Sequence, residues 1–270
     1  MLAFIFGVFG LIIGSFLNVL ILRHGKRSLL GRSACPSCKK TIRWHDLIPV
    51  FSWILLRGRC RDCGRAISIQ YPLVEAGTAV LFFFIALAPI SLSAKILALP
   101  IASLLLAIAV YDFHTTYIPD SWVWTLSALA LLSVAIFPSC SLLTAHCSLS
   151  FLAGPAVALP LFTMWIVSNG KWMGLGDAKF TLSMGWLLGL SGGITALLLA
   201  FVLGAIVSIP LLFFSSPLAR RIAHTLPFDV PAWAYTMKSE VPFGPFLVAS
   251  CFFVWFSQMY AIPLPFSLFI

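Results

Sequence analysis

Charged residues are scarce in this chain of 270 residues, since Asp, Glu, Lys and Arg together make up 9% of it, against roughly 25% in ordinary soluble domains. Only eight residues are acidic, whereas 61% are hydrophobic and 24 are phenylalanine. This shortage of charge excludes intrinsic disorder, a collagen-like fibre, a small disulfide-stapled secreted protein and a conventional soluble enzyme. The composition is that of a membrane protein.

Long hydrophobic runs take the place of charge. A helix must keep about 20 apolar residues in sequence to cross ~30 Å of hydrocarbon, because no backbone polar group can stay unpaired in lipid. The first run has no basic segment before it, so we expect an uncleaved anchor rather than a signal peptide. We predict an all-α polytopic membrane protein of about eight helices, near residues 2–22, 72–89, 94–111, 121–138, 151–169, 178–190, 194–214 and 242–262.

The net charge of +9 is concentrated in one segment. Between Arg23 and Arg65 there are eleven basic and two acidic residues, a balance of 11 − 2 = +9, and the rest of the chain balances at 6 − 6 = 0. A basic block between hydrophobic spans follows the positive-inside rule, which favours a cytoplasmic loop touching anionic lipids over a nucleic-acid site. Counting spans then places the loops 112–120, 170–177 and 215–241 on the same cytoplasmic face.

Two C-x-x-C pairs lie inside the basic block, and their cysteines are Cys35, Cys38, Cys60 and Cys63. Four thiolates at this spacing predict a closed, structural zinc site, and the ion would give its fold to a loop too small to build a core. A redox pair or disulfides remain the alternative, which a reducing cytoplasm disfavours. Cys140 and Cys147, on the opposite side, could form a disulfide.

Of the six carboxylates outside this loop, four lie where ionised groups are costly, namely Glu75, Asp112, Asp120 and Asp177. Asp112 ends the third predicted span and Asp177 opens the sixth, on one face of the membrane, so they could meet. A pair of carboxylates sharing a proton can hold a water and act as base and acid, as in aspartic proteases. The alternatives are a helix N-cap for Asp120 and for Asp177, an interfacial anchor for Asp112, and for Glu75 an ion pair with a residue such as Arg65.

The chain resembles the type IV prepilin peptidases, also called prepilin leader peptidase/N-methyltransferases, through most of its length. The segments that carry the resemblance are Gly14-Ser15-Phe16-Leu17-Asn18-Val19, the cysteine loop running into Tyr71-Pro72-Leu73-Val74-Glu75, Asp112 with Ile118-Pro119-Asp120, Gly174-Leu175-Gly176-Asp177-Ala178-Lys179, and Pro242-Phe243-Gly244-Pro245-Phe246.

This resemblance implies an enzyme of the bacterial cytoplasmic (inner) membrane. Asp112 and Asp177 would be its catalytic pair, cleaving the basic leader from type IV prepilins and type II secretion pseudopilins at the cytoplasmic face. It would then methylate the new N-terminus with S-adenosylmethionine, with Glu75 associated with that activity. The implied supporting residues are Asp120, Gly174, Gly176 and Lys179.

The implied domains are a first helix at 1–22, a zinc-binding domain at 23–71 and a peptidase domain at 72–270. Membrane lipids and pilin precursors are the expected partners, and nucleic acid is not. Two other functions stay open on the residues alone. A proton-coupled transporter with a regulatory zinc loop would need inverted repeats, which the sequence does not display, and a thiol oxidoreductase would use the C-x-x-C pairs.

Overall fold

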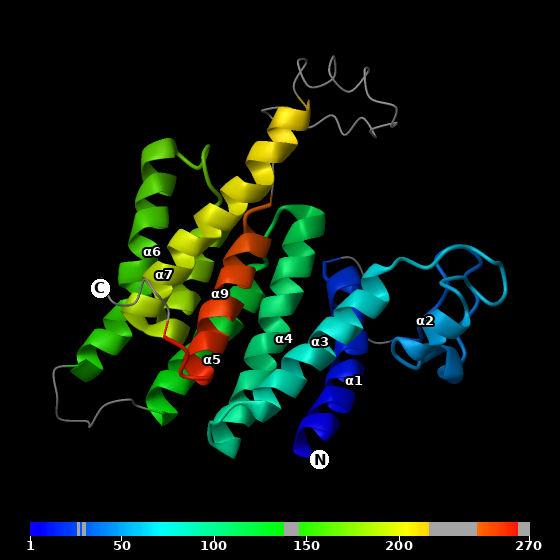
Figure 1. Cartoon of the computed structure of the whole chain (residues 1–270). Coiled ribbons are helices and arrows are strands. Elements are labelled where there is room, and N and C mark those ends of the chain that lie inside the picture. Colours follow the sequence, from blue (N-terminus) through cyan, green and yellow to red (C-terminus); the bar gives the residue numbers. More distant parts are fainter. Residues whose placement is uncertain (26–27, 29–30, 138–145, 216–241, 264–270) are drawn as a thin grey trace. The chain divides into compact units, whose positions relative to one another are not determined.

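The computed structural model describes the chain except for residues 26–27, 29–30, 138–145, 216–241 and 264–270, and Figure 1 shows its helices. Within the described residues the protein is helical and has no β-strand beyond two isolated bridges. The elements are α1 Leu2–Arg23, η1 Trp44–Leu47, α2 Phe51–Leu55, α3 Gln70–Leu87, α4 Leu92–Thr115, α5 Asp120–Ile136, α6 His146–Ser168, α7 Leu175–Ser215 and α9 Gly244–Met259.

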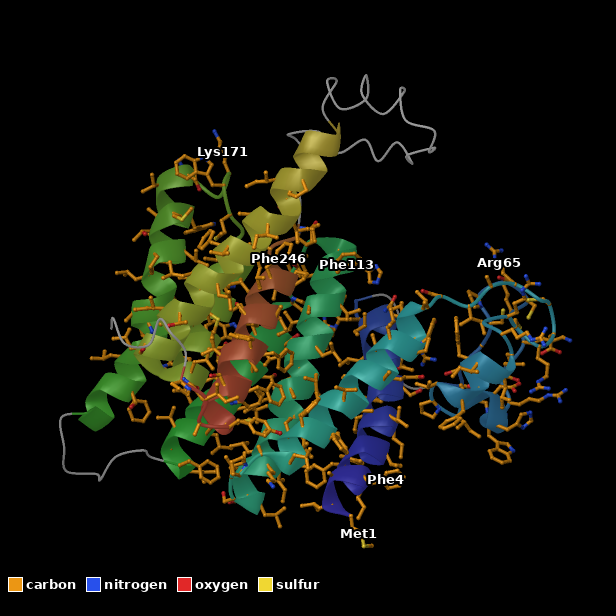
Figure 2. All side chains as sticks on the ribbon, in the orientation of Figure 1. Met1, Phe4, Arg65, Phe113, Lys171 and Phe246 are labelled. Carbon is orange, nitrogen blue, oxygen red and sulfur yellow. The ribbon has the colours of Figure 1, made fainter. Side chains whose placement is uncertain are left out.

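The predicted fold class is confirmed. Five of the described helices, α1, α3, α4, α6 and α7, are long and apolar enough to cross a membrane, and α5 and α9 are shorter apolar helices. Their outer surfaces suit lipid, as Phe4 illustrates by projecting from α1 with 72% of its surface exposed (Figure 2). The predicted disulfide between Cys140 and Cys147 involves Cys140, which lies outside the described residues.

Helix α7 contains the sixth and seventh predicted spans, joined at Gly189. Gly189 has a left-handed φ of 74°, which interrupts the helix. A Cβ placed on Gly193 would lie 3.2 Å from the Cα of Gly185, although eight residues of continuous helix would separate these positions by about 12 Å. The chain therefore turns back at Gly189. When α7 is counted as two helices, the seven apolar helices described (α1, α3, α4, α5, α6, α7 and α9) correspond to the eight predicted spans.

The chain divides into two compact units inside α4, Met1–Val110 and Tyr111–Ile270. In the first unit, α1 and α3 pack closely and antiparallel because α1 presents glycines to α3. A Cβ on Gly10 would lie 2.7 Å from the Cα of Ala79, and one on Gly14 would lie 2.6 Å from the Cα of Glu75. This Gly-x-x-x-Gly spacing is a typical close-contact motif of membrane helices.

In the second unit, α7 packs against α5, α6 and α9. Buried hydroxyls join α5 to α7 through a 2.7 Å hydrogen bond between Ser127 Oγ and Ser183 Oγ. At the turn of α7, Gln258 of α9 donates from Nε2 to the carbonyl oxygen of Leu188 at 2.9 Å. This bond satisfies a carbonyl that the break at Gly189 removes from the helical ladder.

Candidate active site

Asp112 lies in the last turn of α4 and is buried, with 4% of its surface exposed. Its Oδ2 accepts a 2.9 Å hydrogen bond from the backbone N–H of Gly244, the first residue of α9. The first N–H groups of a helix have no partner within the helix and carry partial positive charge, so they suit a carboxylate. Figure 2 labels the neighbouring residues Phe113 and Phe246, which lie at the same end of α4 and α9.

Asp177 is the third residue of α7. Its carboxylate interacts with the backbone amide of Gly174 just before the helix, and it interacts electrostatically with Asp112. Within the second unit the two predicted aspartates, which are 65 positions apart in the chain (177 − 112), are therefore close enough to interact electrostatically. Two carboxylates in such a partly dry site, one of them held by a fixed N–H, can position a water molecule between a base and an acid.

Two further contacts tie the segments that carry these aspartates. Lys179 Nζ and Asp120 Oδ1 form an ion pair at 2.8 Å. A Cβ on Gly176 would lie 3.2 Å from Cβ of the buried Ile118, so the glycine permits close packing between the start of α7 and the loop before α5. Three of the predicted supporting residues therefore join the start of α7 to the segment at the start of α5, namely Asp120, Gly176 and Lys179.

The N-cap alternatives for Asp120 and Asp177 are wrong in the structure. Pro119 is the N-cap of α5, and Asp120 is the first residue inside the helix, with no side-chain capping bond. Asp177 is inside α7 as well. A proline fixes φ in a range that suits this boundary, which explains why the helix begins one residue earlier than the acidic side chain suggested.

The cysteine module, which we define as residues 31–69, holds its cysteines in two similar turns. In the first turn, the N–H of Lys39 donates to the carbonyl of Cys35 at 2.9 Å, and in the second, the N–H of Gly64 donates to the carbonyl of Cys60 at the same distance. Lys39 and Gly64 both have a left-handed φ, 59° and 70°. The repeated turn is how each C-x-x-C pair directs two sulfurs to one side.

The four sulfurs of Cys35, Cys38, Cys60 and Cys63 lie within 4.8 Å of one another. The Cys35 and Cys63 sulfurs are 3.8 Å apart, which equals the edge of a tetrahedron with Zn–S bonds of about 2.3 Å. Backbone amides of Cys38 and Ser37 lower the pKa of the Cys35 thiol to about 6, so this ligand is prepared as a thiolate. The cluster fits one metal ion better than two separate disulfides.

Glu75 lies in α3 and is buried, with 7% of its surface exposed. Its Oε2 accepts a 2.7 Å hydrogen bond from the N–H of Val50 in the cysteine module, and its carboxylate also interacts with the side chain of Ser15 in α1. The suggested ion pair with Arg65 is therefore not formed. Val50 has a φ of 62° and ψ of −51°, a strained conformation for a β-branched residue that Glu75 helps to hold.

Sequence reasoning did not assign roles to Gly244 and Val50. Gly244 lies in a segment that the family resemblance had marked, so a signal was present, but nothing indicated that its backbone N–H meets Asp112. Val50 carried no signal, because a backbone hydrogen bond to Glu75 leaves no trace in residue type.

Two family models match the chain in succession, the Bacterial Peptidase A24 N-terminal domain at residues 8–88 and the Type IV leader peptidase family at residues 99–209. A prepilin leader peptidase/N-methyltransferase of Myxococcus xanthus is 35% identical over 237 residues, which cover 83% of this chain and 67% of that protein. The chain belongs to the type IV leader peptidase family. Proteins named in the same way from Pectobacterium carotovorum and Pseudomonas putida are 33% and 30% identical, over 75% and 94% of this chain and 81% and 91% of their own lengths.

No solved structure matches the chain. Family membership confirms the predicted enzyme class and gives no support to the transporter alternative. The four cysteines lie within the first family match, and both aspartates lie within the second.

Proposed function

We propose that this chain cleaves the leader peptide from prepilins and pseudopilins with Asp112 and Asp177, and then methylates the new N-terminal amine. The observation that carries the proposal is the electrostatic interaction between two carboxylates from α4 and α7, one of them held by the N–H that begins α9. The names of the relatives support the substrate class and the second activity.

The hydrogen bond from Gly244 supports a division of roles between the two aspartates. Oδ2 of Asp112 accepts a hydrogen bond from the Gly244 N–H, and such a bond favours the ionised form of a carboxyl group. Asp112 therefore acts as the base that takes a proton from water, while Asp177 donates a proton to the carbonyl oxygen of the scissile peptide. The tetrahedral intermediate then collapses as the C–N bond breaks: Asp112 gives the leaving amine the proton that it took from water, and a hydroxyl of the intermediate returns a proton to Asp177.

The test is steady-state cleavage of a purified prepilin by the chain carrying Asp112→Asn or Asp177→Asn. Either change should lower kcat by about 10²–10⁴-fold, the range in which a positioned acid or base contributes. Asp62→Asn is the matched control, because it removes a carboxylate paired with Lys40 in the cysteine module and should leave cleavage intact. Cleavage by either aspartate variant at the wild-type rate excludes the proposal.

The orientation we propose places the cysteine module and both aspartates at the cytoplasmic face of the bacterial inner membrane. The positive-inside rule supports it, because the basic segment joins the end of α1 to the start of α3. Protease digestion of inverted and right-side-out vesicles tests it, since the module should be cut only in inverted ones.

We also propose that the four-cysteine site holds structural Zn²⁺, as a part of the predicted domain 23–71. The sulfur spacing supports four-coordinate zinc, and the ion would hold the two cysteine turns together. Metal analysis of the purified chain should give about one zinc per chain. Loss of the ion should open the module and leave the 72–270 peptidase domain folded.

For the methyl donor, S-adenosylmethionine, the residues that fit best lie where α1 and α3 meet. Asn18 donates from Nδ2 to the carbonyls of Gly14 and Tyr71, which leaves its buried Oδ1 without a partner, and the buried Nε2 of Gln70 also lacks one. A buried acceptor and a buried donor without partners are unusual and are available to a ligand. When bound, S-adenosylmethionine supplies the methyl group, and Glu75 positions the adjoining Val50 turn.

The assignment of Asn18 is tested by Asn18→Leu. The variant should cleave prepilin but lose methylation and the binding of radiolabelled S-adenosylmethionine. Retention of both by this variant would count against this location and leave the peptidase proposal standing.

A further inference from the structure

A run of apolar side chains in the cysteine module faces solvent. Within residues 44–55, Trp44, Phe51 and Leu55 are 80%, 62% and 81% exposed. The other exposed apolar residues of this segment are Leu47, Ile48 and Ile54. We call these six side chains the apolar stripe. A metal-stabilised module of this size has no need to expose so many large apolar groups, and such contiguous patches mark contacts with a protein or a membrane.

One hydrogen bond ties the stripe segment to α3, and a second ties it to the part of the module just before α3. Val50 N–H donates to Glu75 at 2.7 Å, and Trp53 Nε1 donates to the carbonyl of Ile67 at 3.2 Å. Glu75 is five residues from Gln70, the start of α3, a distance of about 7.5 Å along a helix with a rise of 1.5 Å per residue. The segment is therefore attached to α3 within two turns of its start. A segment attached there is placed to enter the headgroup region, where interfacial helices bury about 5–10 Å of their apolar face.

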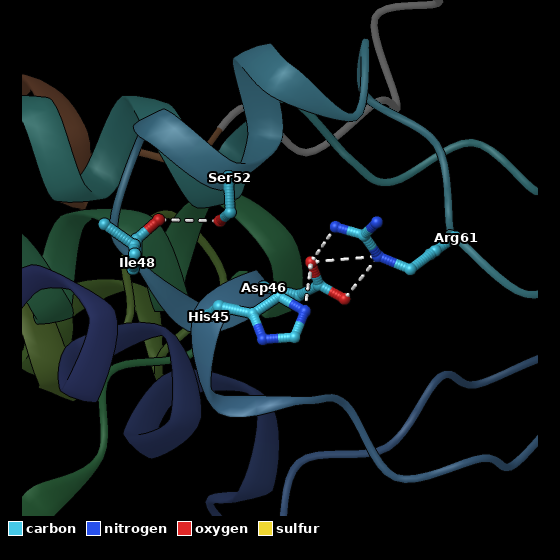
Figure 3. A network of polar contacts seen from close by, with 5 residues as sticks. All are labelled: His45, Asp46, Ile48, Ser52 and Arg61. Atoms are coloured by element: carbon cyan, nitrogen blue, oxygen red, sulfur yellow. Dashed lines mark hydrogen bonds and ion pairs between the residues drawn. The ribbon is translucent and has the colours of Figure 1, made fainter.

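The charges of the module fit an anionic surface. Asp46 is held by Arg61 through a contact of 2.6 Å (Figure 3), and Asp62 pairs with Lys40 at 3.1 Å, so both acids of the module are neutralised by basic partners. The Arg61 guanidinium also holds the pKa of Asp46 below its usual range, so that the carboxylate stays ionised and paired with Arg61.

Basic residues next to the stripe remain available. Arg43 precedes it and Arg57 and Arg59 follow it, and all three are exposed. None of them forms an ion pair with another residue in the described part of the chain. Basic residues beside exposed aromatic and aliphatic groups are typical of segments that lie on anionic bilayers.

We propose that residues 44–55 are an interfacial anchor, whose apolar stripe inserts among anionic lipids beside α1 and α3. Trp44 and Phe51 occupy the headgroup boundary, and the flanking arginines bind lipid phosphates. The anchor holds the metal-binding module against the bilayer surface. The proposal goes beyond the peptidase reaction and does not depend on it, so the two can fail separately.

The test uses the full chain in lipid nanodiscs that contain one copy each. An environment-sensitive fluorescent amino acid replaces Leu55, or Ser37 as the control, an exposed residue in the first cysteine turn. With brominated anionic lipid, emission at position 55 should be quenched several-fold more than at position 37 and shifted to shorter wavelength. Equal quenching at both positions overturns the proposal. A shift that appears only with two copies per disc, or only after prepilin is added, overturns it in favour of a protein partner.

A second measurement avoids the label. Trypsin should cut at Arg57 more slowly in the wild-type chain in anionic nanodiscs than in the variant Phe51→Ser/Leu55→Ser, whose two changes are at exposed positions and spare the metal site. Equal metal content in the two chains shows that both modules are folded. Equal cutting rates then contradict the proposal, and loss of protection in zwitterionic discs supports the role of the arginines.

Discussion

Gly244→Ala is the change that examines the contact between α9 and Asp112. A Cβ at position 244 would lie 2.5 Å from Oδ2 and 2.8 Å from Cγ of Asp112. Carbon–oxygen contacts are ordinarily about 3.3 Å or longer, so the carboxylate or the start of α9 must move by about 0.8 Å. A misplacement of about 1 Å in catalytic geometry can cost on the order of 10²-fold in rate, or about 2.7 kcal/mol. We therefore expect kcat for prepilin cleavage to fall by about that factor.

The assay is single-turnover cleavage of a purified prepilin at saturating enzyme, with thermal unfolding measured in parallel. Gly204→Ala is the matched control, because a Cβ at this position of α7 would meet its nearest neighbour, a ring carbon of Phe246, at an ordinary 3.7 Å. It should cleave at the wild-type rate. If Gly244→Ala also cleaved at that rate, the contact between α9 and Asp112 would have no part in catalysis.

Three further changes probe the scaffold. Lys39→Gly should relieve about 1 kcal/mol of strain at φ 59° and slow the loss of metal to a chelator, and faster loss would contradict the turn geometry. Gln258→Leu leaves the carbonyl of Leu188 unpaired and should cost about 1–3 kcal/mol in thermal unfolding, whereas an unchanged melting temperature would show that the bond contributes nothing. Gly10→Ala should destabilise the α1–α3 pair by about 1–3 kcal/mol, since its Cβ would lie 2.7 Å from a backbone atom. Gly7→Ala is the control and should leave the stability unchanged, because its Cβ would lie 3.9 Å from the nearest atoms. Equal destabilisation by Gly10→Ala and Gly7→Ala would argue against close packing of α1 and α3.

The helices and the residues with the clearest chemistry could be predicted from the sequence. A long apolar run in lipid can form few structures other than a helix, because its backbone polar groups must be paired internally. Acidic residues and paired cysteines are conspicuous in a chain that has few charged residues. The boundary between the sixth and seventh spans was less accurate. The sequence Ser191-Gly192-Gly193 suggested a break there, but the chain turns at Gly189 and the later glycines serve packing, as Gly193 does against Val157.

The remaining contacts depend on backbone groups that residue type does not reveal. The bond from Gly244 to Asp112 joins positions that are 132 residues apart, and it is made by an N–H that every residue except proline has. The bond from Val50 to Glu75 is of the same kind. Sequence identified both acids as functional candidates, but only the folded chain supplies the groups that orient them.

The most direct test of the aspartate pair is the N-terminal mass of a prepilin co-expressed with this chain in cells that have no other prepilin peptidase. With the wild-type chain, the pilin should lack its leader and carry one added methyl group. With Asp112→Asn or Asp177→Asn, it should keep the whole leader and remain unmethylated. A pilin cut at the same position by either variant would contradict the central claim that these two carboxylates together cleave the peptide bond.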